Sequence, residues 1–172
     1  MATNGKRNNL RAWTLFLPGA VRLEGAHEYT PPALTLVKTS IRTGGMDAAI
    51  GLDDGMEELT CSFKIYGYEP AVLALFGLSE GTTSPRITAR QAINAGGWTG
   101  LVEELEGMVS SITPDARPSG ATAEASLTVE MTLTYYRSTW GGTEQALIIP
   151  AQFVRRIQGV DKLAGIRNII RV

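Results

Sequence analysis

The sequence predicts a mainly β protein, an antiparallel β-sandwich or partial barrel with one or two short helices. Three observations support this: period-two alternation of apolar and polar residues in several segments, turn signals between those segments, and only two segments with helical character. The 172 residues show no composition shift and no internal repeat, so we expect a single domain over residues 1–172.

The strongest strand signal covers residues 123–135, where apolar residues alternate without a break with Glu, Ser and Thr. Such alternation is typical of a strand with one face in the core and one face in water. Residues 59–65 and 86–93 repeat the pattern. Gly141-Gly142 predicts a tight hairpin after the long strand. Weaker strand candidates are residues 10–17, 35–41, 101–112 and 145–149.

Two short segments look helical. In residues 69–78, Pro70 stands where a first helical turn tolerates proline, and Gly77 stands where a left-handed cap is common. We expect one short helix there, covering the end of a sheet. Residues 160–166, near the carboxyl end, predict a further turn or two of helix.

Composition excludes several classes of protein. The single Cys61 cannot form a disulfide within the chain, and with one His there is no Cys/His set for structural zinc. No apolar run approaches the roughly 20 residues of a membrane span, and the amino terminus lacks the apolar stretch of a secretory signal. The net charge of −1 argues against tight binding of nucleic acid. We expect no cofactor, no metal and no membrane anchor.

The residues also offer little for catalysis. A lone His27 in a polar loop would have to be the base of any acyl-transfer site, and no Gly-framed Ser accompanies it. Cys61 lies on the apolar face of its predicted strand and is expected in the core. The adjacent pairs Glu103-Glu104 and Asp53-Asp54 are expected to be solvated charge, the second pair in a turn. Neighbours on a strand point to opposite faces, so neither pair is expected to present two carboxylates on one surface for acid/base catalysis. We therefore expect a protein that binds or builds, not an enzyme.

The predicted long strand raises the question of assembly. Its wet face carries Glu, Ser and Thr but no Lys, which commonly protects exposed strand edges from pairing. Edge pairing between identical chains closes into a ring when the rotation per subunit permits. From the pattern alone, such a ring and a monomeric sandwich with short edges both remain open.

Several segments, in order and spacing, point to one family. Residues 30–50, which include Gly44-Gly45-Met46-Asp47, closely resemble the conserved stretch of the major tail tube protein of contractile-tailed bacteriophages and related contractile bacteriocins. Residues 157–168 resemble that family's carboxyl-terminal signature, and residues 14–19 and Tyr135-Tyr136 are similar in position. The chain departs from the family's usual pattern at Ala33, at Pro18 and in its apolar end Ile169-Ile170-Arg171-Val172.

The resemblance implies six-membered rings that stack into a tube, with strands of all subunits joined in one continuous inner β-barrel. It implies a virion tail tube that assembles in the host cytoplasm, lies inside a contractile sheath and conducts DNA through the host envelope. The implied partners are the chain itself, the sheath, tape-measure, baseplate and tail terminator proteins, and DNA in transit. A tube subunit of a contractile bacteriocin or of a bacterial secretion system is the alternative, and a small sandwich enzyme or binding module is a more distant one.

Two sets of site residues follow. The resemblance places an extended loop against the neighbouring ring, and its contact residues are Arg42, Gly44, Gly45, Met46 and Asp47. A conduit also needs a bore that does not hold DNA, and acidic or hydroxyl side chains do not attract phosphate. The wet face of the long strand fits such a lining, although the same face also fits an outer surface seen by the sheath. The lining residues are Glu124, Ser126, Thr128, Glu130, Thr132 and Thr134.

Overall fold

The computed structural model describes residues 8–77, 84–116 and 125–171. These residues form β-strands with two short helices, α1 (Pro70–Leu73) and α2 (Ala164–Ile170). Short 3-10 turns occupy Pro18–Ala20 and Pro150–Gln152. The strands are β1 (Asn9–Leu17), β2 (Val21–Leu23), β3 (Ala26–Thr30), β4 (Leu36–Ile41), β5 (Ile50–Met56), β6 (Thr60–Tyr66), β7 (Arg86–Asn94), β8 (Trp98–Pro114), β9 (Ser126–Trp140), β10 (Thr143–Ile149), β11 (Val154–Ile157) and β12 (Val160–Asp161).

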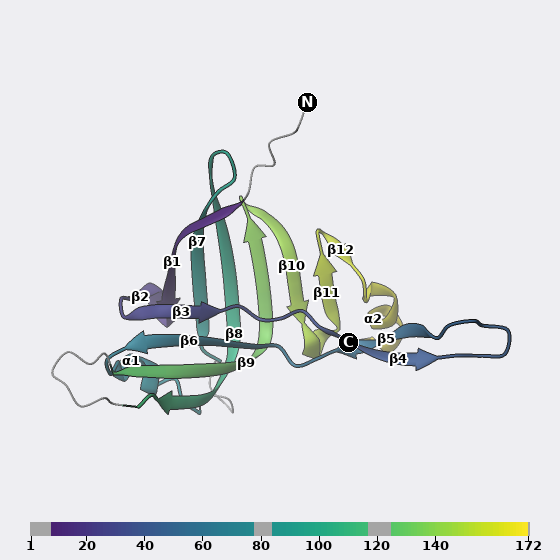
Figure 1. Ribbon diagram of the computed structural model, residues 1–172, viewed down its shortest axis with the longest axis horizontal. Coiled ribbons are helices and arrows are strands. Elements are labelled where there is room, and N and C mark those ends of the chain that lie inside the picture. Colours follow the sequence, from purple (N-terminus) through teal and green to yellow (C-terminus); the bar gives the residue numbers. More distant parts are fainter. Residues whose placement is uncertain (1–7, 78–83, 117–124, 172) are drawn as a thin grey trace.

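The main sheet is antiparallel and divides at β9. Its order is β12-β11-β10-β9-β8-β7-β1-β2, and β8 pairs with β9 along most of the length of both strands. On its other edge, β9 pairs with β6 through residues 126–132 and with β10 through residues 136–140. Outside β6 lies β3. The sheet therefore bends into two layers (Figure 1), which confirms the mainly β, partly sandwiched fold; no barrel closes within the described residues.

A bulge lets β9 serve both layers. In its first half Leu127, Val129, Met131 and Leu133 point into the core, as the alternation predicts. The pairing with β8 then steps from Leu133 to Tyr135 and leaves out Thr134, so that Tyr136 becomes the next buried residue. The extra residue shifts the inward side from odd to even positions. The two halves of one strand thus turn their outward faces to different sides of the sandwich.

The bend depends on a glycine of β8. Gly107 lies beside this bulge, opposite Leu133, at a register shift. A Cβ atom built on Gly107 would lie 2.0 Å from the carbonyl oxygen of Thr132 and 2.7 Å from the Cα of Leu133. No side chain fits against backbone at that distance, so the two strands cross closely here because this residue is glycine.

The core confirms Cys61 as a buried residue and corrects the expectation for Glu103. Cys61 is 3% exposed, and burial, with a smaller effect of the Glu103 charge, raises the pKa of its thiol to about 12. Glu103 is also 3% exposed and is therefore not solvated, as the sequence had suggested. The alternation along β8 explains this, because it turns Glu104 outward and Glu103 inward.

Three neutral donors from different strands surround the Glu103 carboxylate. The Tyr136 hydroxyl donates to Oε1 at 2.8 Å, and the Gln91 amide and Tyr29 hydroxyl donate to Oε2 at 2.6 and 3.1 Å. Burial and then the Glu103 charge raise the pKa of both tyrosines. The cluster joins β3 to β7, β8 and β9, and so connects the two layers of the sandwich through one carboxylate.

Most predicted elements are present with shifted ends. The long strand of residues 123–135 is observed as Ser126–Trp140, and its first residues lie outside the described part of the chain. The helix expected over residues 69–78 is only one turn, α1, with Gly77 at φ +74°. The expected turn at Asp53-Asp54 is wrong, because both residues lie in β5.

The carboxyl-terminal helix also begins later than predicted. Val160–Asp161 forms the short strand β12, and α2 follows from Ala164. The Asp161 carboxylate accepts a hydrogen bond from the Leu163 backbone N–H at 3.1 Å and pairs with Arg167 at 2.7 Å. These contacts hold the pKa of Asp161 below its usual range, and the hydrogen bond from the Leu163 backbone N–H has the largest effect. They join the strand to the helix through a turn that the sequence pattern does not reveal.

Candidate assembly surfaces

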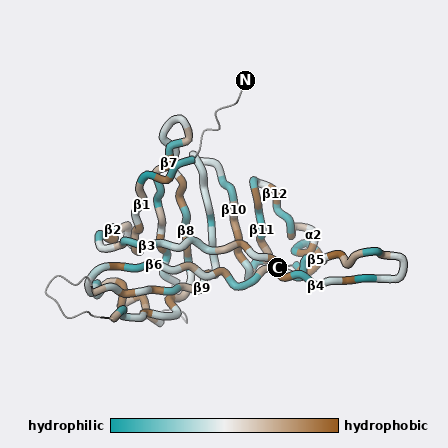
Figure 2. Tube along the Cα trace, viewed as in Figure 1, coloured by the Kyte–Doolittle hydropathy of each residue, from teal (hydrophilic) through white to brown (hydrophobic). Residues whose placement is uncertain are grey.

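Strands β4 and β5 form a two-stranded ribbon that projects from the body of the molecule (Figure 1). Ile41 is paired with Ile50, and Thr39 is paired with Leu52. Figure 2 shows that this ribbon carries hydrophobic segments although it lies outside the body. An isolated two-stranded ribbon is marginally stable in water, so this one is expected to pack against something else.

The two faces of the ribbon differ in chemistry. One face carries Lys38, Ser40 and Gly51, which are polar or small. The opposite face carries four aliphatic residues that are between 39% and 49% exposed, beside Thr39, whose hydroxyl donates a hydrogen bond to the Asp54 carboxylate at 2.9 Å. A contiguous exposed apolar surface is typical of an interaction site. The members of this apolar ribbon face are Val37, Ile41, Ile50 and Leu52.

The predicted contact loop forms the tip of the ribbon. Arg42, Gly44, Gly45 and Asp47 are exposed there, and Met46 is half-buried. The Arg42 Nε donates to the Met46 carbonyl at 3.3 Å, and the Met46 N–H donates to the Thr43 carbonyl at 3.1 Å. Gly45 has φ +92°, a conformation that favours glycine, whereas the φ of Gly44 is not positive. The structure thus brings these five residues together at the end farthest from the body.

An ion pair fixes the foot of the ribbon. Arg155 of β11 contacts the carboxylate of Asp53 with both terminal nitrogens, across 102 positions of sequence. The hydrogen bond from Arg155 is the main reason that the pKa of Asp53 lies below its usual range. The Gly55 N–H, which donates to the same carboxylate at 3.0 Å, lowers this pKa further. Sequence reasoning missed this pair, because nothing in the local pattern joins positions so far apart.

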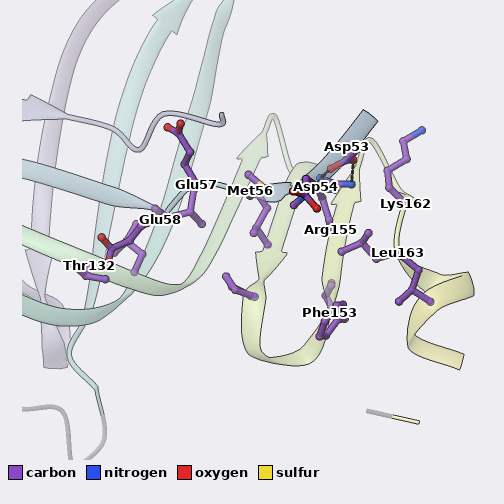
Figure 3. A pocket seen from close by; sticks show the side chains of 17 residues that line it. Asp53, Asp54, Met56, Glu57, Glu58, Thr132, Phe153, Arg155, Lys162 and Leu163 are labelled. Carbon is purple, nitrogen blue, oxygen red and sulfur yellow. Dashed lines mark hydrogen bonds and ion pairs between the residues drawn. The ribbon is translucent and has the colours of Figure 1, made fainter. Parts of the chain in front are cut away.

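A groove of about 680 Å³ lies at the foot of the ribbon (Figure 3). Residues 53–59 form one wall, and residues 150–155 and 162–166 form the other. The Asp53–Arg155 pair lies on its rim, with Lys162 nearby and Glu57 and Glu58 toward β6. The interior is mostly apolar and includes Met56, Leu59, Leu133, Ile148, Val154 and Leu163.

The predicted bore residues share the outer face of the β3-β6-β9 layer, apart from Glu124, which lies outside the described residues. Ser126, Thr128 and Thr132 are partly exposed, and Glu130 and Thr134 are exposed. Asp115 accepts hydrogen bonds from Ser126 at 2.5 Å and from Thr128 at 3.3 Å, and the Ser126 contact is the main reason its pKa is lowered. Thr60 and Ser62 of β6 extend this face, which is rich in hydroxyl groups.

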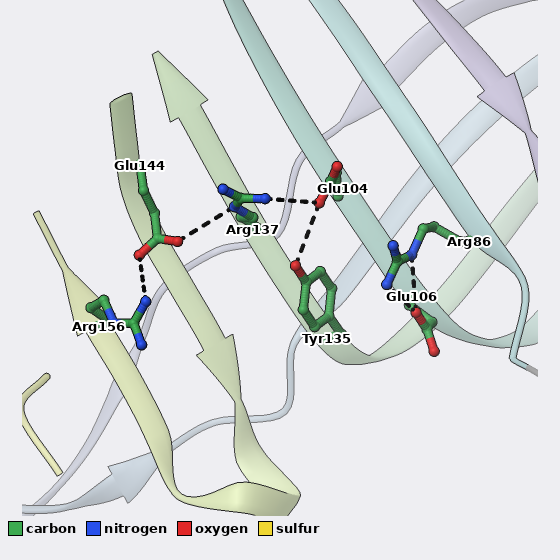
Figure 4. A network of polar contacts seen from close by, with 7 residues as sticks. All are labelled: Arg86, Glu104, Glu106, Tyr135, Arg137, Glu144 and Arg156. Atoms are coloured by element: carbon green, nitrogen blue, oxygen red, sulfur yellow. Dashed lines mark hydrogen bonds and ion pairs between the residues drawn. The ribbon is translucent and has the colours of Figure 1, made fainter. Parts of the chain in front are cut away.

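The opposite outer face, over β7 to β11, carries a network of arginines and glutamates (Figure 4). Arg86 pairs with Glu106 at 2.9 Å, and this hydrogen-bonded contact is the main reason that the pKa of Arg86 is raised. Exposed pairs of this kind contribute little each to stability. A chain of further ion pairs runs from Glu104 to Arg137 at 3.8 Å, from Arg137 to Glu144 at 3.4 Å and from Glu144 to Arg156 at 3.3 Å.

His27 packs against an aromatic ring. Its ring stacks on Tyr66, with ring centroids 3.8 Å apart. Within the described ranges, no three His, Cys, Asp or Glu residues are placed to hold a metal ion. The same residues contain no helix long and apolar enough to cross a membrane.

A β-rich body whose projecting ribbon exposes aliphatic side chains offers a surface for contact with other chains. The family model of phage tail tube protein FII matches residues 7–170 of the 172. The chain therefore belongs to the phage tail tube protein family, a family of virion structural proteins that assemble into a tube with other tail components. Among curated proteins, none matches the chain.

Proposed function

We infer that residues 1–172 form one tail-tube domain, six copies of which make a ring, and that the rings stack into the tube of a contractile tail. The strands of neighbouring copies join into a continuous inner barrel. The tube assembles in the host cytoplasm around the tape-measure protein, between baseplate and tail terminator and inside the sheath. On contraction it passes through the host envelope and conducts DNA.

The apolar ribbon face is the observation that supports this proposal most directly. Burial of an aliphatic side chain contributes about 1.5–3 kcal/mol when complete, so each half-exposed residue has about half of that to gain. Val37, Ile41, Ile50 and Leu52 remain between 39% and 49% exposed within their own chain, because the ribbon projects away from the body. Contact with a neighbouring ring gives this apolar face a partner, with the tip residues Arg42 to Asp47 at the same interface.

Electron microscopy of the concentrated protein tests the proposal. We expect rings or tubes from the wild-type chain, and neither from the double variant Ile50→Ser/Leu52→Ser, because the interface loses its apolar contacts. The melting temperature of the monomer should stay close to that of wild type, since both side chains are exposed. Lys38→Ser, on the opposite ribbon face, is the control and should assemble. Wild-type protein that stays monomeric at high concentration would refute the tube.

The bore is assigned to the hydroxyl-rich face of β9, with Ser126, Thr128, Glu130 and Thr132, and with Glu124 on sequence grounds. On this face, Lys64 forms an ion pair with Glu28 at 3.3 Å. Glu130 and Asp115 add further negative charge to the same face. On the opposite face, the three arginines in Figure 4 are matched by Glu104, Glu106 and Glu144, so that network has no excess of acid. Since cations facing DNA bind its phosphates, the face with excess acid is the better conduit.

Glu130→Lys should leave tubes intact but slow DNA delivery, because the new cation recurs in every subunit along the bore. The measurement is infectivity, or the rate of DNA ejection, of phage carrying the variant tube. Glu130→Gln removes the charge without adding a cation and should deliver DNA at nearly the wild-type rate. Normal infectivity of the Lys variant would place β9's first half on the outside of the tube.

A further inference from the structure

We propose that the groove at the foot of the ribbon is the socket that receives the ribbon tip of a second copy of this chain. The inference rests on the proposed function, since it names the site at which successive rings join. It assigns the two halves of one contact: the apolar ribbon face with its tip, and the groove between residues 53–59 and the carboxyl-terminal segment.

The groove cannot be filled by the ribbon of the same chain. Residues 53–56 belong both to the groove wall and to β5, so the ribbon starts at the groove and extends away from it. The Asp53–Arg155 pair holds that foot in place. A ribbon that occupies the groove must therefore come from another molecule.

The groove and the ribbon match in polarity. The groove presents apolar side chains such as Met56, Val154 and Leu163. The ribbon offers four aliphatic side chains on one face, each more than a third exposed. Docking one on the other removes both surfaces from water in a single contact.

Charges at the two surfaces are complementary. Within the described residues, Glu57 and Glu58 on the groove form no ion pair, and neither does Lys162. The ribbon tip carries Arg42 and Asp47, which also form no ion pair there. Arg42 therefore has an acidic counterpart on the groove, and Asp47 has a basic one. Such pairs across an interface fix register and partner choice more than affinity.

Each copy has one tip and one groove, so the contact is head-to-tail. A heterologous contact whose rotation does not close a ring continues without limit. Because the proposed contact joins successive rings, it predicts stacking of indefinite length, distinct from the contacts that close each ring.

Charge exchange tests the contact. Arg42→Glu, and separately Glu57→Lys/Glu58→Lys, should raise the protein concentration needed for tube formation about tenfold, equivalent to ~1.4 kcal/mol. The chain carrying all three changes should form tubes at close to the wild-type concentration, because the opposite charges face one another again. These side chains are exposed, so thermal melts should show all variants folded. Single variants that assemble like wild type, or a combined variant that assembles no better than they do, would overturn the socket.

Cross-linking tests the same contact without relying on charge. An Arg42→Cys chain mixed with a Glu58→Cys chain and a short bis-maleimide should give a covalent dimer under conditions of tube assembly. An Arg42→Cys chain mixed with a Glu24→Cys chain, altered in the exposed turn after β2, should not. The native Cys61 is buried and stays unreactive. Tubes that cross-link only through Glu24→Cys would refute the socket but leave the proposed tube function standing. Wild-type protein that forms no assembly would refute the proposed function itself.

Discussion

Gly107→Ala is expected to destabilise the protein by about 3 kcal/mol or more, because a side chain there must force two strands apart. The added Cβ would lie 2.0 Å from the Thr132 carbonyl oxygen, and the nearest atoms all belong to the backbone. Backbone paired on both sides of β9 has no simple way to move. We expect the loss in urea unfolding as a lower midpoint with little change in slope.

Gly100→Ala is the matched control in the same strand. A Cβ on Gly100 meets no atom within 4 Å, and its φ lies outside the positive range. Its unfolding free energy should stay within about 0.5 kcal/mol of wild type. Equal losses in the two variants would show that the requirement for glycine comes from strand conformation in general and not from the crossing at Thr132.

Glu103→Leu is expected to lower the unfolding free energy by about 3 kcal/mol or more, since it leaves three donors in or near the core without their acceptor. The donors are the hydroxyls of Tyr29 and Tyr136 and the amide of Gln91. Because buried donors are costly only when unpaired, adding Tyr29→Phe and Tyr136→Phe should recover part of the loss. The measurement is the same urea titration, analysed as a mutant cycle.

Glu104→Gln, one residue along β8, is the control for this cluster. Its carboxylate lies 3.8 Å from Arg137 and accepts from the Tyr135 hydroxyl at 3.4 Å on the outer face. Exposed contacts of this kind contribute roughly 0–1 kcal/mol. A loss for Glu104→Gln as large as that for Glu103→Leu would contradict the assignment of the inner cluster as the stabilising one.

The sequence predicted the regular parts of the fold well for a physical reason. Alternation along a strand depends on neighbouring residues only, so the inward positions Leu127 to Leu133 and the core position of Cys61 were accessible from the pattern. The one-turn helix at Pro70 was also anticipated, although its length was not. Ends shifted because the last residues of an element are fixed by its neighbours in space.

What the sequence did not predict depends on contacts between distant segments. The bulge at Thr134 breaks the alternation in a stretch that otherwise looks regular, and Glu103 looks like any surface carboxylate until Tyr29 and Tyr136 are placed around it. The Asp53–Arg155 pair spans most of the chain. The tip residues were identified through family resemblance, but the apolar ribbon face beside them was not.

The bulge in β9 has a consequence for how this protein can change. One continuous strand supplies hydroxyl groups to one exterior and an arginine-bearing surface to the other, and only the unpaired Thr134 separates these two frames. Deleting a single residue there would carry Arg137 inward and Tyr136 outward, together with every position beyond them. Point substitutions can adjust either exterior on its own, but an insertion or deletion in this strand would exchange inside for outside along half of its length.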